Sequence, residues 1–194
     1  MSLKRASQLI VGSRCTEGSL NESLAGVMLM AAVVAGTGGA PTPWETYLAL
    51  PSAENAAKVE RIEYSSGEPA PVGYRALDLQ ILRLQVVAGD IEAFRLAYRL
   101  RERSDAGLLE ELTGILARAI RPQPDMFLEA VSSLRPSRAA LESILMMPGL
   151  EYVDRPRAQG FEIAMRRKAI EGVQVPRLRG AQERCLELLP GGGI

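Results

Sequence analysis

Apolar residues between positions 72 and 190 recur every three or four residues, and closely spaced prolines, glycines and aspartates separate the runs. This spacing is typical of amphipathic helices, whereas strict alternation would indicate strands. Helices of roughly 10 to 18 residues, joined by connections of roughly 2 to 5 residues, bury an apolar stripe only against neighbouring helices. We therefore predict an all-α fold of antiparallel helix pairs, stacked either as a HEAT-like array or as an irregular bundle.

Residues 40–71 precede this array and predict two short helices and a loop. Thr42-Pro-Trp-Glu45 has the form of a capping box, with proline in the first turn, where its missing N–H costs nothing. Ser52 then caps a second short helix. The run 65–71 is rich in Ser, Gly and Pro and predicts a loop, so the helical array comprises residues 72–190.

Breakers inside residues 72–190 divide the array into helices. Gly89-Asp90, Asp105, Pro124 and Ser137 supply ends and caps. The widest stripe, Leu108 to Ile120, predicts a central helix that is buried on more than one side. The core faces predicted for three other helices are Leu77, Ile81, Leu84 and Val87, with Leu82 broadening this face; Ile91, Phe94, Ala97 and Tyr98; and Phe161, Met165 and Ala169, with Ile163, Ile170 and Val173 widening the last.

Residues 24–35 form an apolar run with basic residues upstream and small residues downstream. A run of about a dozen residues is too short for a membrane-spanning helix, which takes about 20, and fits the apolar region of a signal peptide. We therefore interpret residues 1–39 as a signal peptide cleaved near Gly39, which predicts a periplasmic or secreted protein. The alternative is that the run is the buried first helix of a cytoplasmic helical adaptor. Residues 191–194 predict a flexible tail.

Charge and cysteine content restrict the partners of the mature protein. Three of the 23 basic and two of the 23 acidic residues precede Pro41, so the remainder carries a formal charge of −1. No net positive field is available to hold nucleic acid, and no membrane anchor is expected after cleavage. Cys185 would be the one cysteine left, and its apolar neighbours indicate a buried, unreactive thiol.

The chain contains no histidine, which excludes Ser-His-Asp and Cys-His catalysis and histidine-ligated zinc. No EF-hand pattern is present, because Asp90, Asp105 and Asp125 stand alone at helix starts, where capping explains them. We therefore predict an absence of metal and of cofactors.

Carboxylates leave one catalytic alternative open, a hydrolase that uses a lone acid. Glu110 and Glu111 are adjacent on one helix, so their side chains diverge and do not form a facing pair. Glu129, Glu142 and Glu162 are predicted as isolated exposed positions.

Two clusters are candidates for binding. Arg166 and Arg167 follow Phe161 by one to two turns, and arginine beside an aromatic ring is a common binding anchor. Trp44 and Tyr47, on the first short helix, form a candidate aromatic patch. The alternative for the two arginines is a solvated basic face. The alternative for the two aromatic residues is that they pack the first short helix onto the array. Solvated outer positions are likewise predicted for Arg95, Arg99, Arg101, Glu102 and Arg103.

Short motifs over most of the mature chain carry a resemblance. They are Leu50-Pro-Ser-x-x-Asn-Ala56, Pro124-Asp-Met-Phe-Leu128, Tyr152-Val-Asp154, Arg166 with Ala169-Ile170 and Val173, and Arg184-Cys185 with Leu188. Together they resemble a group of small exported helical proteins of Gram-negative bacteria, often lipoproteins, with HEAT-like helix pairs. The resemblance implies a helical fold and an exported location, and it supplies no activity or site residues. The absence of a lipoprotein cleavage box argues against a lipid anchor.

These observations predict a non-enzymatic exported protein that binds another macromolecule, with a protein as its partner and a monomer or weak oligomer as its state. An inhibitor, an immunity protein or an envelope adaptor fits, since each needs a complementary surface and no catalytic residues. The alternative is a periplasmic hydrolase using a lone carboxylate.

Overall fold

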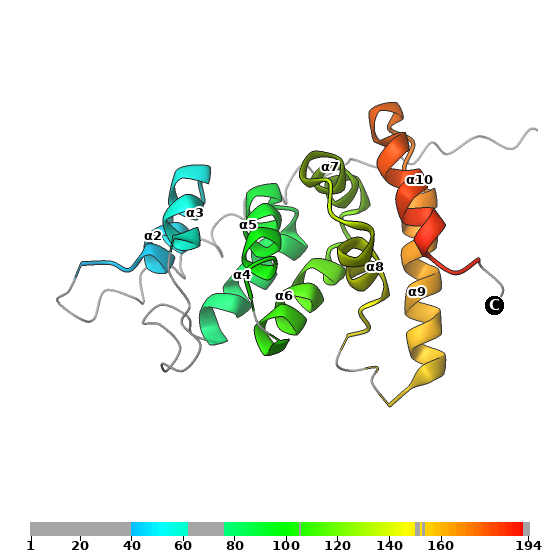
Figure 1. Cartoon of the computed structure of the whole chain (residues 1–194), viewed down its shortest axis with the longest axis horizontal. Helices are drawn as coiled ribbons and strands as arrows, with labels where there is room; N and C mark the ends of the chain where they lie inside the picture. The colour runs from blue at the N-terminus through cyan, green and yellow to red at the C-terminus, as the bar shows by residue number, and fades with distance from the viewer. Residues whose placement is uncertain (1–39, 62–75, 105, 150–151, 153, 192–194) are drawn as a thin grey trace, which may run out of the picture. The chain divides into compact units, whose positions relative to one another are not determined.

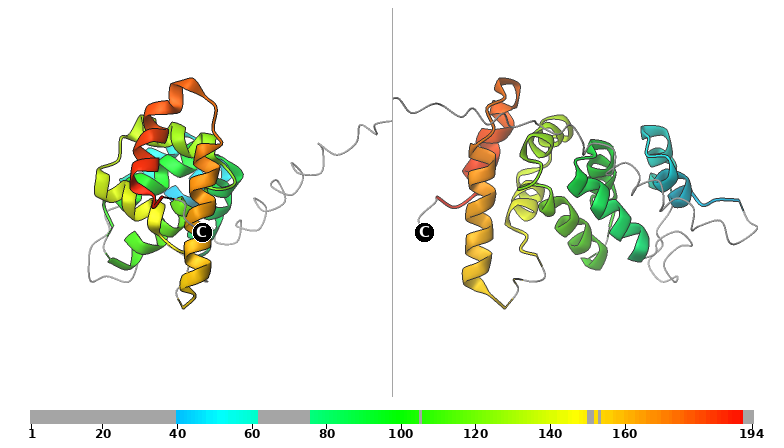
Figure 2. Two further views of the ribbon diagram at one scale, coloured as in Figure 1. Left: turned by 90° about the vertical axis from the view of Figure 1, so that its right-hand side faces the viewer. Right: turned by 180° about the vertical axis from the view of Figure 1, so that it is seen from behind.

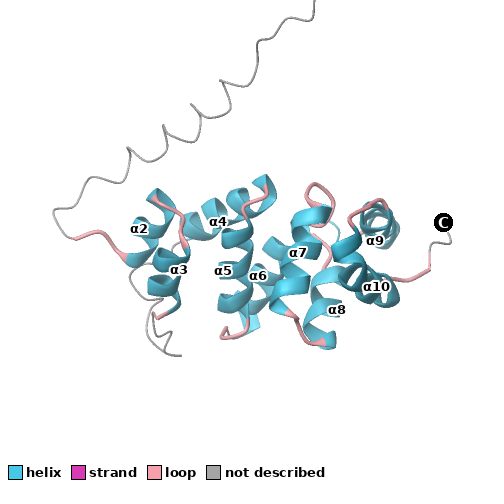
Figure 3. Ribbon diagram, turned by 90° about the horizontal axis from the view of Figure 1, so that it is seen from above, coloured by secondary structure: helices cyan, strands magenta, loops and turns pink. Residues whose placement is uncertain are grey.

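The computed structural model describes residues 40–61, 76–104, 106–149, 152 and 154–191, apart from the side chains at 76, 77 and 106. These residues belong to one compact unit, Gly39–Ile194. Within them the chain forms nine α-helices and a short 3-10 helix, with no strand (Figure 3), so the predicted all-α class is confirmed. The predicted signal peptide, the 65–71 loop, the Asp105 cap and residues 192–194 of the predicted tail lie outside the described residues.

The helices pack in chain order. The main contacts join helices that are one, two or three positions apart along the chain, and successive pairs follow one another in Figure 1. At the C-terminal end, α9 and α10 lie side by side and run in opposite directions (Figure 2). The helices are α2 (Pro43–Ala49), α3 (Ala53–Glu60), α4 (Ala76–Ala88), α5 (Ile91–Arg101), α6 (Ala106–Arg118), α7 (Pro124–Leu134), α8 (Arg138–Met146), α9 (Pro156–Glu171), the 3-10 helix η3 (Pro176–Leu178) and α10 (Arg179–Leu188).

Predicted caps begin four of these helices. Thr42 and Glu45 form a complete capping box: the Glu45 N–H donates to Thr42 Oγ1 at 3.1 Å, and the Thr42 N–H donates to Glu45 Oε2 at 2.9 Å. Ser52, Asp90 and Ser137 each accept a backbone N–H in the first turn of α3, α5 and α8. These side chains satisfy donors that a helix start leaves unpaired.

The turn between α4 and α5 needs glycine. Gly89 has a φ of +97°, a region that side-chain-bearing residues rarely adopt. A Cβ atom there would also lie 3.0 Å from the Gln123 side chain, whose amide approaches the Val87 carbonyl at the end of α4. The short connection turns α5 back onto α4, as the Gly89-Asp90 pair predicts.

α6 lies in the middle of the described array and contacts α4, α5 and α8, which confirms the predicted central helix. Leu112, Ile115 and Leu116 from this helix are buried in the main core. The core also joins α5 to α7 through Phe94 and Phe127, whose rings meet edge to face with centroids 5.8 Å apart.

The core face predicted for α4 is wrong. Leu84 lies on the predicted face and is 58% exposed, whereas Leu79 and Val86, outside that face, are buried together with Leu82, which was predicted at its margin. α4 carries apolar residues on all sides, so its sequence contains two stripes at helical spacing. The spacing alone does not say which stripe the neighbouring helices cover.

The stripe predicted for α9 is also misplaced. Phe161 is 56% exposed, and Met165 and Ala169 are only partly buried. The residues that α9 buries are Ile163, Arg166 and Ile170, which the prediction assigned to the margin of the stripe or to solvent. An arginine in the middle of the true core face made that face look polar, and the opposite stripe looked more apolar.

Among the described helices, none combines the length and apolar character that crossing a bilayer requires.

Candidate functional site

Arg166 is buried and caps a neighbouring helix. Its Nη1 donates to the carbonyl of Leu145, in the last turn of α8, at 3.0 Å and to that of Met147, the residue that follows α8, at 2.7 Å. Its Nε donates to Glu162 Oε1 at 3.2 Å. Burial lowers the pKa of the guanidinium, and the Glu162 carboxylate opposes that shift. The predicted exposed anchor is therefore corrected to a group that fixes α9 on the end of α8.

Arg167 does the same for α10. Its Nη1 donates to the carbonyls of Leu186 at 3.1 Å and Leu189 at 2.9 Å, and its Nε pairs with Glu171 at 2.8 Å. Consecutive arginines point in different directions around a helix, so one caps each neighbour of α9. Cationic donors at helix C-termini satisfy carbonyls that have no partner within the helix.

Side chains from later segments cap earlier ones elsewhere in the unit. The Gln182 amide donates to the carbonyls of Ile170 at 2.8 Å and Val173 at 3.0 Å, at the end of α9. Arg184 donates to the Pro136 carbonyl at 2.8 Å, between α7 and α8. Arg103 donates to the Glu60 carbonyl at the end of α3. Several arginines and glutamines that the sequence would place on the exposed surface therefore hold the array together by capping neighbouring helices.

The prediction that Arg101 lies on the solvated outer side of its helix is also wrong. It is only 6% exposed, and its Nε donates to Thr113 Oγ1 on α6 at 2.9 Å. Its Nη1 also pairs with Glu102 at 3.0 Å. The arginine is thus part of the contact between α5 and α6.

Trp44 and Tyr47 do not form an exposed patch. Both residues are fully buried, and their rings meet edge to face with centroids 6.3 Å apart. Burial is the main cause that raises the pKa of the Tyr47 hydroxyl well above its usual value. Packing of α2 onto the array, the alternative to a binding patch, is what the structure shows.

Two glutamates predicted as isolated are paired. Glu162 accepts from Arg166 and, through Oε2, from Arg121 at 2.7 Å, and its side chain is largely buried. Glu129 pairs with Arg177 at 3.2 Å. Glu162 therefore ties α9 to the residues that follow α6.

Cys185 is buried in the core, as its apolar neighbours predict. Burial raises the pKa of its thiol to about 12, with a smaller opposing effect from Arg184. A thiol in this state is protonated at physiological pH and therefore a poor nucleophile.

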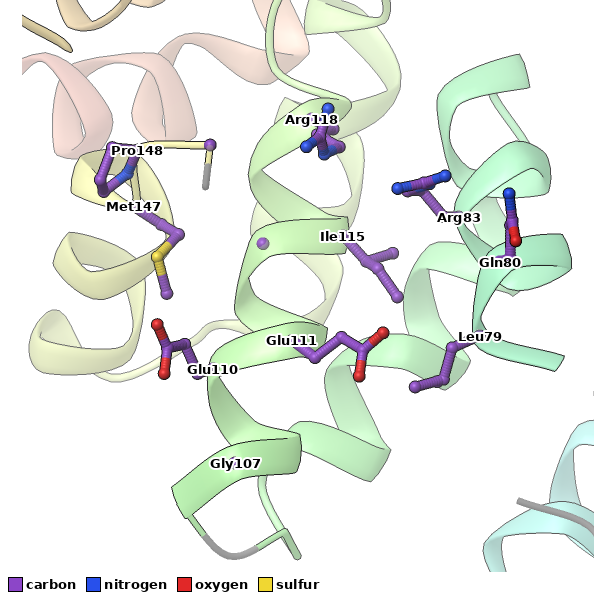
Figure 4. A pocket seen from close by; sticks show the side chains of 12 residues that line it. Leu79, Gln80, Arg83, Gly107, Glu110, Glu111, Ile115, Arg118, Met147 and Pro148 are labelled. Carbon is purple, nitrogen blue, oxygen red and sulfur yellow. The ribbon is translucent and has the colours of Figure 1, made fainter. Parts of the chain in front are cut away.

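An open pocket of about 560 Å³, here called the first pocket, lies over α6 (Figure 4). Leu79 of α4 and Ile115 of α6 contribute apolar surface, and the segment 147–149 after α8 forms the opposite wall. Glu110 and Glu111 lie toward one end and diverge, as predicted, while Arg83 and Arg118 lie toward the other. One of the two carbonyls that Arg166 caps, that of Met147, belongs to this wall, so the buried arginine supports the shape of the pocket.

A second pocket of about 700 Å³ adjoins the first and shares Arg118 and Gly149 with it. Apolar atoms come from Val87 at the end of α4 and from Met165 and Ala169 of α9. The charged residues in its lining are Arg118, Arg121, Glu162, Arg166 and Lys168.

Both helices whose core face was wrongly predicted, α4 and α9, contribute to the lining of the second pocket. Val87, from the predicted α4 stripe, and Met165 and Ala169, from the predicted α9 stripe, line the second pocket. These stripes are real apolar surfaces that the core does not cover. Exposed apolar surface rimmed by charge is typical of an interaction site.

Gly107 and Gly114 line the first pocket from α6, one heptad apart. A Cβ atom added at either position would meet nothing within 4 Å, so packing does not require glycine there. Glycine inside a helix costs about 1 kcal/mol relative to alanine. An unexplained glycine pair on the face of the central helix is therefore a sequence signal of the pocket that hydrophobic spacing alone does not reveal.

In the described part of the chain, no group of three or more Cys, Asp or Glu residues is arranged to hold a metal ion. Comparison with known proteins adds no relative, since no family model, curated protein or solved structure matches the chain.

Proposed function

We propose that this protein is a non-enzymatic binding protein that holds a segment of another protein across the first and second pockets. The observation that carries the proposal is the second apolar face of α9: Met165 and Ala169 line the second pocket and are only partly buried, and Phe161, on the same face outside the pocket, is largely exposed. An exposed apolar face lowers the solubility of a folded chain. A partner that covers the face would remove this cost.

The first pocket has the composition of a segment-binding surface. Apolar residues such as Leu79 and Ile115 form its interior, and Arg83, Glu110 and Glu111 surround it. In the described part of the chain these three charged side chains have no ion pair or hydrogen bond, so they are available to a partner. Apolar contacts supply affinity and charged rims supply specificity.

The proposed partner class is a toxin, an envelope enzyme or an envelope assembly factor, with the protein as its inhibitor, immunity protein or adaptor. This class rests on the export signal that the sequence predicts, because export brings the protein into contact with envelope and secreted proteins. Binding of this kind needs a complementary surface and no reacting groups.

The pocket is tested with two substitutions at Gly114. Gly114→Ala is expected to raise the free energy of unfolding by about 0.5–1 kcal/mol, because the helix gains propensity and the methyl group meets open space. Gly114→Leu is expected to fold, to fill the first pocket and to weaken binding by about 100-fold. The ligands are twelve-residue peptides selected from a random display library on the full-length chain, with affinities measured by fluorescence anisotropy.

Gly180→Leu is the matched control, since Gly180 is another helical glycine with open space around its Cα that does not line either pocket. The proposal fails if the selected peptides bind the Gly114→Leu and Gly180→Leu variants as tightly as the native chain. Urea denaturation of all three variants separates a loss of binding from a loss of folding.

Export is tested by fractionating cells that express the native gene and weighing the recovered protein. We expect a protein in the periplasm or the medium that lacks about the first 39 residues, because signal peptidase cuts after small residues. A full-length mass of 21.0 kDa in the cytosol would replace the envelope partner with a cytoplasmic one.

A further inference from the structure

The second pocket is locally basic in a protein whose formal net charge is zero. Its lining contains four cationic residues, Arg118, Arg121, Arg166 and Lys168, and one acidic residue, Glu162. Glu162 offsets part of this charge through its bonds to Arg121 and Arg166. Lys168 leaves a positive excess, and within a chain of zero net charge this excess acts on whatever enters the pocket.

Lys168 is the clearest element of that excess. It lies on α9, it is exposed, and it lines the second pocket. Within the described residues its side chain has no hydrogen bond or ion pair, whereas its neighbours Arg166 and Arg167 are committed to capping helices. Its ammonium group is therefore available to an anionic ligand.

The same pocket offers apolar contacts beside the charge. Met165 and Ala169 lie one turn apart on α9, and Val87 adds apolar surface from α4. A ligand that satisfies the whole surface must carry both an anionic group and an apolar group a few ångströms apart. Acidic and apolar side chains of one peptide segment meet this requirement.

We infer that the second pocket binds an acidic stretch of the partner protein, with a carboxylate facing Lys168 and an apolar side chain on Met165 and Ala169. The inference rests on the proposed function. It specifies that the part of the partner segment lying in the second pocket is acidic. At the far end of the first pocket, Glu110 and Glu111 repel an acidic stretch. Charge therefore fixes the direction in which the segment lies across the two pockets.

Three synthetic twelve-residue peptides test the inference on the full-length chain. They share the same apolar residues and carry four glutamates, four glutamines or four lysines at the same positions. We expect the glutamate peptide to bind about tenfold more tightly than the glutamine peptide, and the lysine peptide to bind more weakly than both. Lys168→Glu is expected to weaken binding of the glutamate peptide by about tenfold. The variant would then bind the glutamate peptide no more tightly than the glutamine peptide.

Arg138→Glu is the matched control, because Arg138 is exposed on α8 and lines neither pocket. If the glutamate and glutamine peptides bind equally and both lose affinity in Gly114→Leu, the acidic assignment is wrong and the binding function stands. If no peptide responds to Gly114→Leu, the proposed function itself is wrong. A DNA dodecamer or phosphatidylglycerol vesicles that bind more tightly than the glutamate peptide, and lose binding in Lys168→Glu, would overturn the assignment of a protein ligand.

Discussion

Replacing Arg166 with alanine is expected to lower the free energy of unfolding by about 3–5 kcal/mol, the range for breaking a buried charged pair by removing one partner. The substitution leaves the carbonyls of Leu145 and Met147 without their donor. It also removes one of the two arginines that bind the largely buried Glu162. An uncompensated polar group in the interior costs more than the native pair contributes.

Urea denaturation measures this loss, and two further variants identify its cause. Arg166→Lys keeps the charge and loses the planar guanidinium that reaches two carbonyls and a carboxylate. We therefore expect its free energy of unfolding to lie between those of the native chain and Arg166→Ala. Arg167→Ala removes a similar set of carbonyl bonds at a more exposed position, and we expect a loss of about 1–2 kcal/mol. Equal losses for Arg166→Ala and Arg167→Ala would contradict the buried position of Arg166.

Replacing Phe127 with alanine is expected to cost about 3–5 kcal/mol, because the ring is fully buried and the substitution leaves a cavity. Phe127 lies against Phe94, so its loss weakens the contact between α5 and α7. The measurement is again the free energy of unfolding in urea.

Phe161→Ala is the matched control for this substitution. Phe161 belongs to a stripe with core spacing and yet is 56% exposed, so we expect a change within about 0.5 kcal/mol. A loss at Phe161 as large as that at Phe127 would show that the α9 stripe is covered after all. Together the two variants separate the covered face of the array from the open one.

The caps and the central helix could be predicted from the sequence because both depend on neighbouring residues. A capping box needs only Thr42 and Glu45, three positions apart, and both bonds are present. The stripe on α6 is wide enough that Leu112, Ile115 and Leu116 are buried whichever neighbour covers them.

The covered faces of α4 and α9 could not be predicted, because each helix has two apolar stripes and only its neighbours decide between them. In α9, Arg166 made the covered face look polar, since its carbonyl partners lie about 20 positions earlier in the chain. A guanidinium bound by carbonyls and a carboxylate is compatible with burial. The spacing of apolar residues cannot predict such a buried arginine, because it counts every arginine as polar.

The pockets could not be predicted either, because α4, α6, α9 and the segment after α8 build them together. Of the four residues proposed from sequence as binding anchors, only Arg166 lines a pocket, and its hydrogen bonds are used for capping. The glycines of α6 were the local signal that pointed to this site.

We propose that a segment of another protein binds across the first and second pockets. The most direct test is the change in backbone amide chemical shifts of the full-length protein when a library-selected peptide is added. We expect the largest changes at Gly107 and Gly114 on α6 and at Lys168 and Ala169 on α9, and small changes at Arg138 and Gly180. Saturable binding with unchanged shifts at the first four residues, and large changes elsewhere, would contradict the claim.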